Sequence, residues 1–148
     1  MNSLTIEYSL PLPYRHYAGA IGSRFLRELR DNKKIVGSKC PECKRVYVPA
    51  RSICPRCLVP IEEIVPVSDK GVLVTYARVN HKESVQPVHG WFMYGIFKLD
   101  GADTNIVHFL DSKDTEKARP GMRVQAVWKP REQRVGRLTD IQCVKLID

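Results

Sequence analysis

The hydrophobic pattern divides this chain into a helical beginning and a β-rich remainder. In the first part, large apolar side chains recur every four residues, at Tyr17, Ile21, Phe25 and Leu29. That spacing places them along one face of an α-helix. Beyond residue 67, apolar and polar positions alternate instead, as they do in strands that bury one face. The pattern therefore predicts an N-terminal helical arm over 1–33 and a mainly β fold after it.

The predicted helix starts near Tyr14, because Pro13 suits a first-turn position. Gly19 and Gly22 weaken its middle, so two short helices fit the sequence as well as one. The apolar stripe needs a cover, and two covers stay open. The stripe packs on the rest of the chain, or it docks a partner protein or a second copy. Under the second alternative the docking residues are Tyr17, Ile21, Phe25 and Leu29.

Five strands are predicted in the last part of the chain, 67–148. Four of them cover residues 72–77, 91–99, 105–110 and 122–128, and the fifth ends near Ile147. A short polar segment, 112–119, is predicted to be helical. Three strands, a short helix and a two-strand hairpin follow one another in the order of an OB-fold, a small partly open barrel. A five-stranded sandwich has the same number of strands and stays open.

Between these two parts lie two closely spaced cysteine pairs. Cys40 and Cys43 form the first pair, and Cys54 and Cys57 form the second. Each CxxC turn presents two sulfurs, so the two turns together can surround one metal ion. Zinc suits four thiolates in a closed tetrahedral site, and iron in a rubredoxin-like site is the alternative. Because the segment is too short to fold by apolar burial alone, we expect the metal to be structural.

The cysteine segment is predicted to be a small module of its own, the zinc ribbon, over 34–66. Short strands are expected to leave each cysteine turn, at 45–49 after the first and at 61–67 after the second. Pro66 marks an edge position in the second of these strands. The predicted organisation is therefore mainly β: an arm, 1–33, a rubredoxin-like zinc ribbon, 34–66, and a five-stranded OB-fold barrel, 67–148.

Composition narrows the class of protein. Of the 148 residues, 43% are hydrophobic and 27% are charged, which is typical of a chain with a core and a polar surface. The sequence has no apolar run near the roughly 18 residues of a membrane span, and its first 13 residues lack the pattern of a secretory signal. Four cysteines assigned to a metal fit a reducing compartment, so a cytoplasmic protein is expected. The net charge of +8 suits a nucleic acid, an acidic protein or a phosphorylated cofactor.

Residue types that commonly carry catalysis are present but scattered. The sequence contains no HExxH, GxSxG, P-loop or GxGxxG motif. His108 lies inside a predicted strand, where a structural role is the commoner one. Cys143 is a lone thiol in an alternating strand, and such thiols are usually inert. A metal with four protein sulfurs has no open position for water. We therefore expect a protein that is not an enzyme.

A basic cluster lies at the turn before the last strand. It consists of Lys129, Arg131, Arg134 and Arg137. These side chains either face solvent or contact the phosphates of a ligand.

A second candidate surface consists of aromatic side chains on the second predicted barrel strand, with Tyr76 on the first. By alternation, Trp91 and Phe97 share one face of the second strand, and Phe92 and Tyr94 share the opposite face. One face must belong to the core. The other can line a groove for stacked bases or for a thioester chain.

Several motifs together resemble a known family. They are 22–26 and 28–31 in the arm, Gly37, the two Pro-containing cysteine turns, 46–49 after the first turn, Gly71 at the start of the barrel, and 120–124 before its fourth strand. This combination is similar to the zinc-ribbon/OB-fold proteins of archaea and bacteria that accompany thiolases. The likeness covers nearly the whole chain, and the arm with the first cysteine turn is its most specific part. The family often has a proline-aromatic step before the second barrel strand, whereas this chain has Gly90-Trp91-Phe92.

The resemblance implies a non-catalytic partner of acyl-CoA enzymes. Members of the family associate with thiolase-like proteins and are thought to bind, shield or channel acyl-CoA. A structural Zn²⁺ would fix the angle between arm and barrel, the arm would dock the enzyme, and a groove between ribbon and barrel would hold part of the CoA. The ligand-binding residues under this hypothesis are Tyr76, Trp91, Tyr94, Lys129, Arg131 and Arg134. The alternative hypothesis is a single-stranded nucleic-acid-binding protein, because both modules bind nucleic acids elsewhere.

Overall fold

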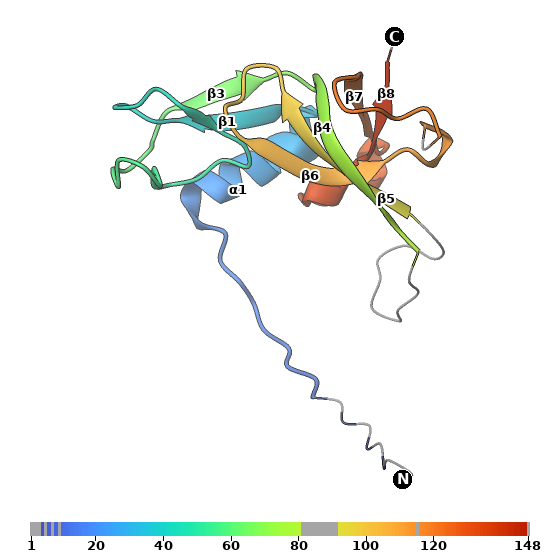
Figure 1. Ribbon diagram of the computed structural model, residues 1–148. Helices are drawn as coiled ribbons and strands as arrows, with labels where there is room; N and C mark the ends of the chain where they lie inside the picture. Colours follow the sequence, from blue (N-terminus) through green and yellow to red (C-terminus); the bar gives the residue numbers. More distant parts are fainter. Residues whose placement is uncertain are drawn as a thin grey trace.

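The computed structural model describes residues 4, 6, 8, 10–80, 92–114 and 116–147. A three-stranded sheet in the order β2-β1-β3 lies beside a closed barrel in the order β4-β5-β6-β8-β7, and a short helix packs against both (Figure 1). This architecture confirms the predicted mainly β fold, with a helical segment, a ribbon and a five-stranded barrel following one another along the chain.

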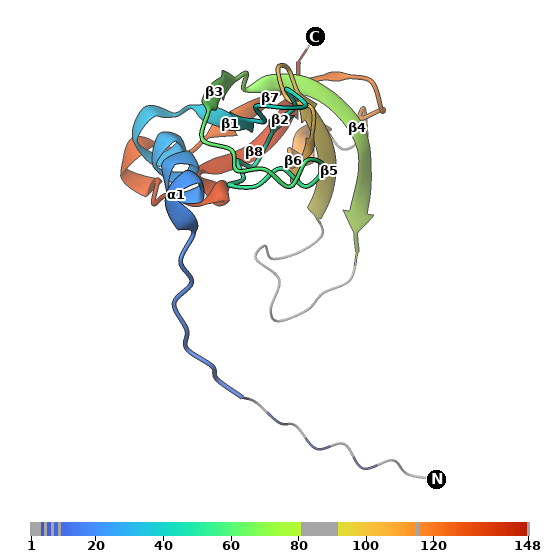
Figure 2. The ribbon, with the colours of Figure 1, turned by 90° about the vertical axis from the view of Figure 1, so that its left-hand side faces the viewer.

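The helix begins later than the sequence pattern suggested. Helix α1 covers Gly19–Arg27 and continues without a break into a π-helical turn, η1, over Glu28–Asn32. The helix ends where Lys33 adopts a left-handed backbone with φ of 55°, and the N–H of Lys34 donates to the carbonyl of Glu28. The predicted start near Tyr14 is therefore wrong. Residues 10–18, which precede the helix, form an extended segment that runs away from the globular body (Figures 1 and 2).

The ribbon is a small antiparallel sheet. Its central strand, β1 (Ile35–Lys39), pairs with β2 (Val46–Tyr47) on one side and with β3 (Ile64–Val67) on the other. The sequence pattern had indicated strands near the positions of β2 and β3 but had not indicated β1. Pro66 lies in β3, an edge strand, where its missing N–H costs no ladder hydrogen bond.

The barrel strands lie close to their predicted positions. They are β4 (Lys70–Val79), β5 (Phe92–Leu99), β6 (Asn105–Leu110), β7 (Arg123–Trp128) and β8 (Ile141–Leu146). All neighbouring pairs are antiparallel except β6 with β8, which pair in parallel at Leu110 and Val144. That pair closes the barrel in the strand order of an OB-fold. In the segment 112–119, predicted to be helical, the described residues contain a single 3₁₀ turn, η2 (Ser112–Asp114).

Gly95 illustrates how closely the barrel interior is filled. It lies two residues before Phe97, which is fully buried. A Cβ atom at position 95 would collide with the Phe97 ring. Glycine therefore leaves room in the middle of β5 for the largest fully buried side chain.

One hydrophobic core connects the three parts. Phe25 and Leu29 from the helix, Val48 from the ribbon and Phe97 from the barrel belong to the same buried cluster. Asp103, in the turn before β6, also accepts the N–H of Val46 at 2.8 Å, which ties the ribbon to the barrel. The three segments that the sequence predicts, 1–33, 34–66 and 67–148, thus contribute to one core. None of the described helices is long and apolar enough to cross a membrane.

Candidate metal centre and ligand surface

The four paired cysteines converge at one end of the ribbon. The sulfurs of Cys40, Cys43, Cys54 and Cys57 all lie within 4.8 Å of one another. Cys40 and Cys54 are fully buried, and a small apolar cluster that includes Tyr47 and Ile61 surrounds them. The spacing predicted from sequence therefore corresponds to a real cluster of donors in space.

The two cysteine turns have the same backbone design. The first cysteine of each pair accepts an N–H four residues on: Lys44 donates to the carbonyl of Cys40, and Leu58 to that of Cys54. Lys44 and Leu58 both adopt left-handed backbones, with φ of 60° and 58°. Glycine takes this conformation most easily, so these positions carry local strain that metal binding must offset.

Tyr47 contacts the metal site, although the sequence pattern did not indicate it. Its hydroxyl lies 3.2 Å from Sγ of Cys54 and 4.0 Å from Sγ of Cys43. Burial opposes ionisation of Cys54, but hydrogen bonds to its sulfur, first from Tyr47 and then from backbone N–H groups, lower its pKa to about 6. Tyr47 lies on β2, four residues after Cys43. The sequence predicted a strand at 45–49 but gave no sign of a role for Tyr47 at the metal.

Cys57 shows why this cluster needs a cation. Burial and the neighbouring sulfur of Cys43 raise the pKa of Cys57 to about 12. Four thiolates at this spacing repel one another, and a bound divalent ion removes the repulsion. The separation of 3.7 Å between Sγ of Cys43 and Sγ of Cys54 agrees with a tetrahedron built on Zn–S bonds of about 2.3 Å, whose sulfurs lie about 3.8 Å apart. The donors therefore fit zinc, and all four ligands come from the protein.

The residues predicted to dock a partner fall into two groups. Phe25 and Leu29 are 3% and 0% exposed and belong to the chain's own core. They are covered by the rest of the chain, so the docking role predicted for them is not compatible with this fold. Ile21 is half-buried on α1. Tyr17 precedes the helix and is 81% exposed.

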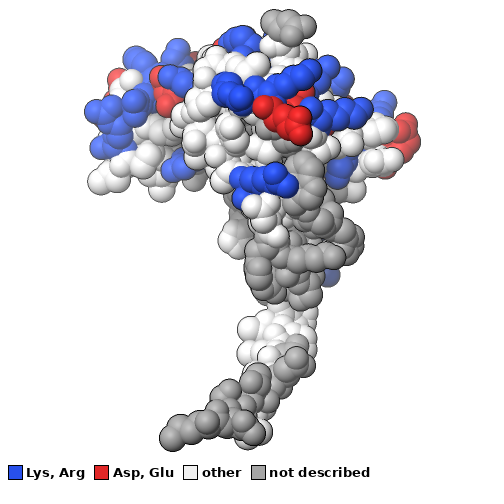
Figure 3. Space-filling model, turned by 45° about the vertical axis from the view of Figure 1, so that its right-hand side comes forward, with Lys and Arg blue, Asp and Glu red and all other residues white. Residues whose placement is uncertain are grey.

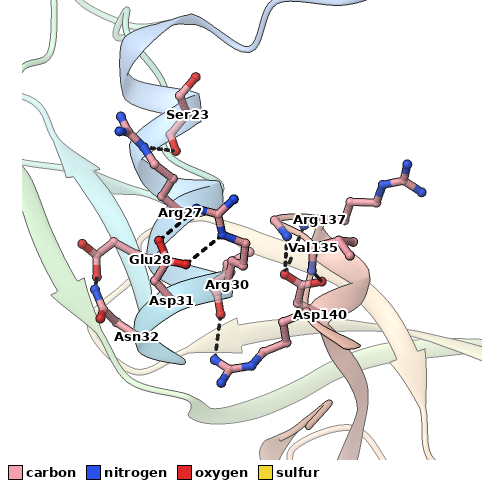
Figure 4. Close-up of polar contacts among 12 residues, drawn as sticks. Ser23, Arg27, Glu28, Arg30, Asp31, Asn32, Val135, Arg137 and Asp140 are labelled. Carbon is pink, nitrogen blue, oxygen red and sulfur yellow. Dashed lines mark hydrogen bonds and ion pairs between the residues drawn. The ribbon is translucent and has the colours of Figure 1, made fainter. Parts of the chain in front are cut away.

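The basic turn before β8 is organised by a buried carboxylate. Asp140 is fully buried and accepts backbone N–H groups from Val135, Gly136 and Arg137 at 2.7–3.2 Å (Figure 4). This arrangement folds the turn against the helical segment. Arg134 then donates through Nη1 to the carbonyl of Leu29 at 3.4 Å.

The predicted phosphate-binding residues therefore have different surroundings. Arg134 is half-buried and joins the barrel turn to the helix, which is a structural contact. Arg131 is exposed on a 3₁₀ turn, η3 (Arg131–Gln133). Lys129 follows β7 directly and lines a hollow in the barrel surface. On the face shown in Figure 3, Lys and Arg side chains are spread over the body, with acidic side chains among them, and do not form one stripe.

The aromatic residues of β5 divide between the two faces of the strand as alternation predicts. Phe97 is in the main core, whereas Phe92 and Tyr94 lie on the opposite face with Phe109 of β6, where Phe92 is itself buried at 8% exposure. Tyr94 and Phe109 stack with ring centroids 5.1 Å apart, and Phe92 meets both rings edge-on. Tyr76 is half-buried and packs against the main core. Trp91 lies outside the described residues.

A hollow of about 690 Å³ opens in the barrel surface next to this aromatic cluster. Phe92, Phe109, Lys113, Lys129 and Cys143 are among its lining residues. It lies within the barrel and not between ribbon and barrel, where the family resemblance had suggested a groove. Of its lining residues, Lys129 belongs to the ligand-binding set predicted from the sequence, and Phe92 belongs to one of the two strand faces that could line a groove.

His108 and Cys143 have the surroundings of structural groups. His108 is buried, its Nδ1 accepts the N–H of Phe109, and its Nε2 lies 3.2 Å from the carbonyl of Leu138. Burial lowers the pKa of His108, which keeps the ring neutral. Burial, with help from Asp111, raises the pKa of Cys143 to about 11. A neutral thiol is a poor nucleophile, so neither group is prepared for catalysis.

Comparisons with known proteins agree with this architecture. The model of the "ChsH2, rubredoxin-like zinc ribbon domain" family matches residues 27–62, and that of the "ChsH2, C-terminal OB-fold domain" family matches residues 64–129. A DUF35 domain-containing scaffold protein of Methanocaldococcus jannaschii is 29% identical over 107 residues, which are 72% of this chain and 75% of that protein.

Two solved structures share the fold. A DUF35-family protein of unknown function from Sulfolobus solfataricus has a TM-score of 0.63 at 21% identity, over 86% of this chain and 84% of its own. A chain of the Ltp2-ChsH2(DUF35) aldolase has a TM-score of 0.59 at 20% identity, over 76% and 87%. Both family models match in the order that the structure shows, ribbon before barrel. The two ChsH2 family models together span most of the chain, so it combines the ChsH2 rubredoxin-like zinc ribbon domain with the ChsH2 C-terminal OB-fold domain, and its four clustered cysteines form the zinc site of the ribbon.

Proposed function

We propose that this chain is a non-catalytic scaffold that binds a thiolase-like acyl-CoA enzyme together with acyl-CoA. The name of the archaeal relative and the aldolase complex among the similar structures support this direction. The zinc site has four protein ligands and so leaves no position for a substrate. A structural ion suits a protein whose work is to hold others in place.

The observation that carries the proposal is the apolar segment before α1. Its large side chains are between 62% and 88% exposed: Leu4, Ile6, Tyr8, Leu10, Leu12, Tyr14 and Tyr17. Leaving this much apolar surface in water is unfavourable, and such surfaces usually mark a binding site. Docking is therefore assigned to this segment, upstream of the helix face that the sequence pattern had suggested.

The same segment has the pattern of a strand that lacks a partner. From Leu4 to Tyr14 every even position is large and apolar, whereas the odd positions include Pro11 and Pro13. In an extended chain, even residues share one face and also direct their N–H groups to one edge. Pro11 and Pro13 are odd positions and fall on the other edge. The edge formed by the even residues therefore keeps all of its backbone N–H groups. A segment of this kind can add to the edge of a partner's sheet and bury its apolar face there.

The free edges of the chain itself are too short to receive this segment. Within the described residues, β2 has two residues and β3 has four, one of them a proline. In the barrel, β6 meets β8 only at Leu110 and β4 meets β7 only over Lys70–Val72, and the edges that these strands leave unpaired are shorter than the segment. An eleven-residue strand, 4–14, fits a longer edge on a different protein better than it fits a second copy.

Affinity purification followed by reconstitution tests the docking role. The tagged full-length chain is expected to retain an acyl-CoA enzyme, identified by mass spectrometry and then mixed in pure form with the chain. Replacing Ile6, Leu10 and Leu12 with serine should abolish the complex. The matched control replaces Thr5 and Ser9 with alanine and should keep it. Equal binding of the enzyme by the two variants would show that segment 4–14 is not the docking site.

Calorimetry tests the ligand. Titrations with decanoyl-CoA, CoA and a single-stranded oligonucleotide separate the two hypotheses, and decanoyl-CoA is expected to bind most tightly. Failure of decanoyl-CoA to bind would contradict the acyl-CoA part of the proposal.

A second candidate function is single-stranded nucleic-acid binding. The stacked pair of Tyr94 and Phe109 on the outer face of β5 and β6 favours it, because OB-folds commonly bind single strands on these two strands. This function predicts oligonucleotide binding that weakens steeply as salt concentration rises. The net charge of +8 allows it, but the exposed apolar segment and the spread of Lys and Arg over the face shown in Figure 3 favour the scaffold.

A further inference from the structure

The hollow in the barrel surface arises from the way the barrel closes. Strand β6 pairs with β8 only at Leu110 and Val144, and the two strands run parallel there. Along the rest of their length no ladder joins them, which leaves an opening between β5 and β6 on one side and β8 on the other. The hollow of about 690 Å³ occupies this place, and its volume lies within the usual range for small-molecule sites, about 300–1,000 Å³.

Its lining combines an apolar wall with a positively charged rim. Phe92 and Phe109 form the wall, and Tyr94 supports them from the same strand face. Lys113 from η2 and Lys129 from the end of β7 bring two ammonium groups. In the part of the chain that the structure describes, neither lysine forms a salt bridge.

One acidic residue shares the hollow. Asp111 accepts the backbone N–H of Lys113 at 3.0 Å through Oδ1, and Sγ of Cys143 lies 4.0 Å from its Oδ2. These contacts occupy its two oxygens. The two ammonium groups of Lys113 and Lys129 outnumber the single carboxylate of Asp111, so the rim has a net positive charge. A ligand that matches both wall and rim has an apolar chain and a negatively charged group.

Free fatty acids and acyl-CoA thioesters both have this chemistry. We infer that the hollow between β6 and β8 binds acyl-CoA, with the acyl end against Phe92 and Phe109 and phosphate groups near Lys113 and Lys129. This inference rests on the proposed function and gives it a location. It also gives a role to the two phenylalanine rings and the two lysines that line the same hollow.

Cys143 provides a reporter inside the hollow. It is the fifth cysteine of the chain, and the other four are zinc ligands. It is half-buried and lines the hollow, so a bound ligand would cover it. Its thiol is neutral near pH 8, which makes alkylation slow and its rate easy to follow.

The experiment measures alkylation of Cys143 by N-ethylmaleimide in the zinc-loaded full-length chain, located by peptide mass spectrometry. Saturating decanoyl-CoA is expected to slow the reaction about five-fold or more, because only the unliganded fraction reacts. CoA and decanoate should each protect less, since each offers only part of the ligand. Protection by decanoate equal to that by decanoyl-CoA would assign the site to free fatty acids and overturn the inference.

Variants test the rim and wall by calorimetry. Lys113→Gln combined with Lys129→Gln should weaken decanoyl-CoA binding about ten-fold or more, because charge-assisted contacts are lost. Lys98→Gln is the matched control, since Lys98 is exposed on β5 at the opposite end from Phe92, and it should bind as the parent does. Phe109→Ala should reduce the dependence of affinity on acyl length and leave CoA binding unchanged.

The outcomes separate the two proposals. If decanoyl-CoA binds but neither protects Cys143 nor responds to the two lysine substitutions, the ligand lies elsewhere, so this inference fails while the proposed function stands. If decanoyl-CoA shows no binding at all, both fail. Protection of Cys143 by the oligonucleotide alone would assign the hollow to nucleic acid and overturn the inference.

Discussion

The hydroxyl of Tyr47 lies 3.2 Å from Sγ of Cys54, a metal ligand seven residues away. This contact joins the strand that leaves the first cysteine turn to the first sulfur of the second turn. A hydrogen bond from a neutral hydroxyl stabilises the thiolate and fixes its direction. Tyr47 therefore helps to hold the zinc site together, although it is not itself a metal ligand.

Removing this hydroxyl should weaken zinc binding without abolishing it. Tyr47→Phe keeps the buried ring but loses the hydrogen bond to Cys54, so we expect zinc affinity to fall about ten-fold or more. Competition with a chromophoric chelator measures the change. Tyr94→Phe makes the same substitution on the outer face of the barrel, and its zinc affinity should equal that of the parent. Equal affinities for all three proteins would show that the contact does not matter for the metal.

Loss of a ligand should destabilise the whole chain. Cys40→Ser removes a fully buried zinc ligand, and the ribbon shares its core with helix and barrel. We therefore expect one cooperative unfolding transition at a lower temperature and protein that retains less zinc. Cys143→Ser alters a cysteine outside the site and should keep both zinc and stability. A barrel that unfolds at the parent temperature without zinc would contradict the shared core.

The helix should behave as part of the core. Leu29 is fully buried, so Leu29→Ala is expected to lower the free energy of unfolding by about 2–5 kcal/mol. Tyr17 is 81% exposed, and Tyr17→Ala should change it by no more than about 0.5 kcal/mol. Urea unfolding followed by circular dichroism measures both. A small effect at Leu29 would mean that the helix packs less firmly than the structure shows.

Stability should fall on mild acidification because of His108. Burial lowers its pKa below that of the unfolded chain, so protons bind the unfolded state preferentially. The stabilisation is complete above the ordinary pKa of His, about 6.5, and is lost as the pH falls toward the lower pKa of the folded state.

His108→Gln should flatten this dependence between pH 7 and 5, since glutamine cannot become protonated in that range. His16→Gln, at an exposed position, should leave the pH dependence unchanged. Urea midpoints at the two pH values supply the measurement. An identical acid slope in the parent and in the His108 variant would assign the effect to other groups.

The local sequence pattern was sufficient to predict those features that depend on a short segment alone. Two CxxC turns present thiolates whatever surrounds them, so the ligands Cys40, Cys43, Cys54 and Cys57 could be named from spacing alone. Alternation along β5 likewise separated Phe97 from Phe92 and Tyr94. Both are properties of short segments, set by turn geometry and by the two-residue period of a strand.

The sequence pattern gave wrong predictions where the same residues are compatible with two different structures. The four-residue repeat from Tyr17 to Leu29 fits a docking face and a core face equally well, and the fold covers its C-terminal half. The basic turn gave no sign that Asp140 would organise it or that Arg134 would reach Leu29, 105 residues earlier in the chain. Strand β1 was missed because its pairing partners come later in the chain, β2 after the first cysteine turn and β3 after the second.

The sequence by itself determined the order of elements, the metal ligands and the alternation that fills the barrel, because these depend on neighbours within a few residues. Only the tertiary structure decided which apolar residues the chain covers itself and where the barrel leaves an opening. Those outcomes depend on which segments meet: helix with barrel at Leu29, and β6 with β8 at a single pair. Which side chains become buried and where cavities form depend on contacts between segments that are distant in the sequence. No single stretch of the sequence therefore predicts them.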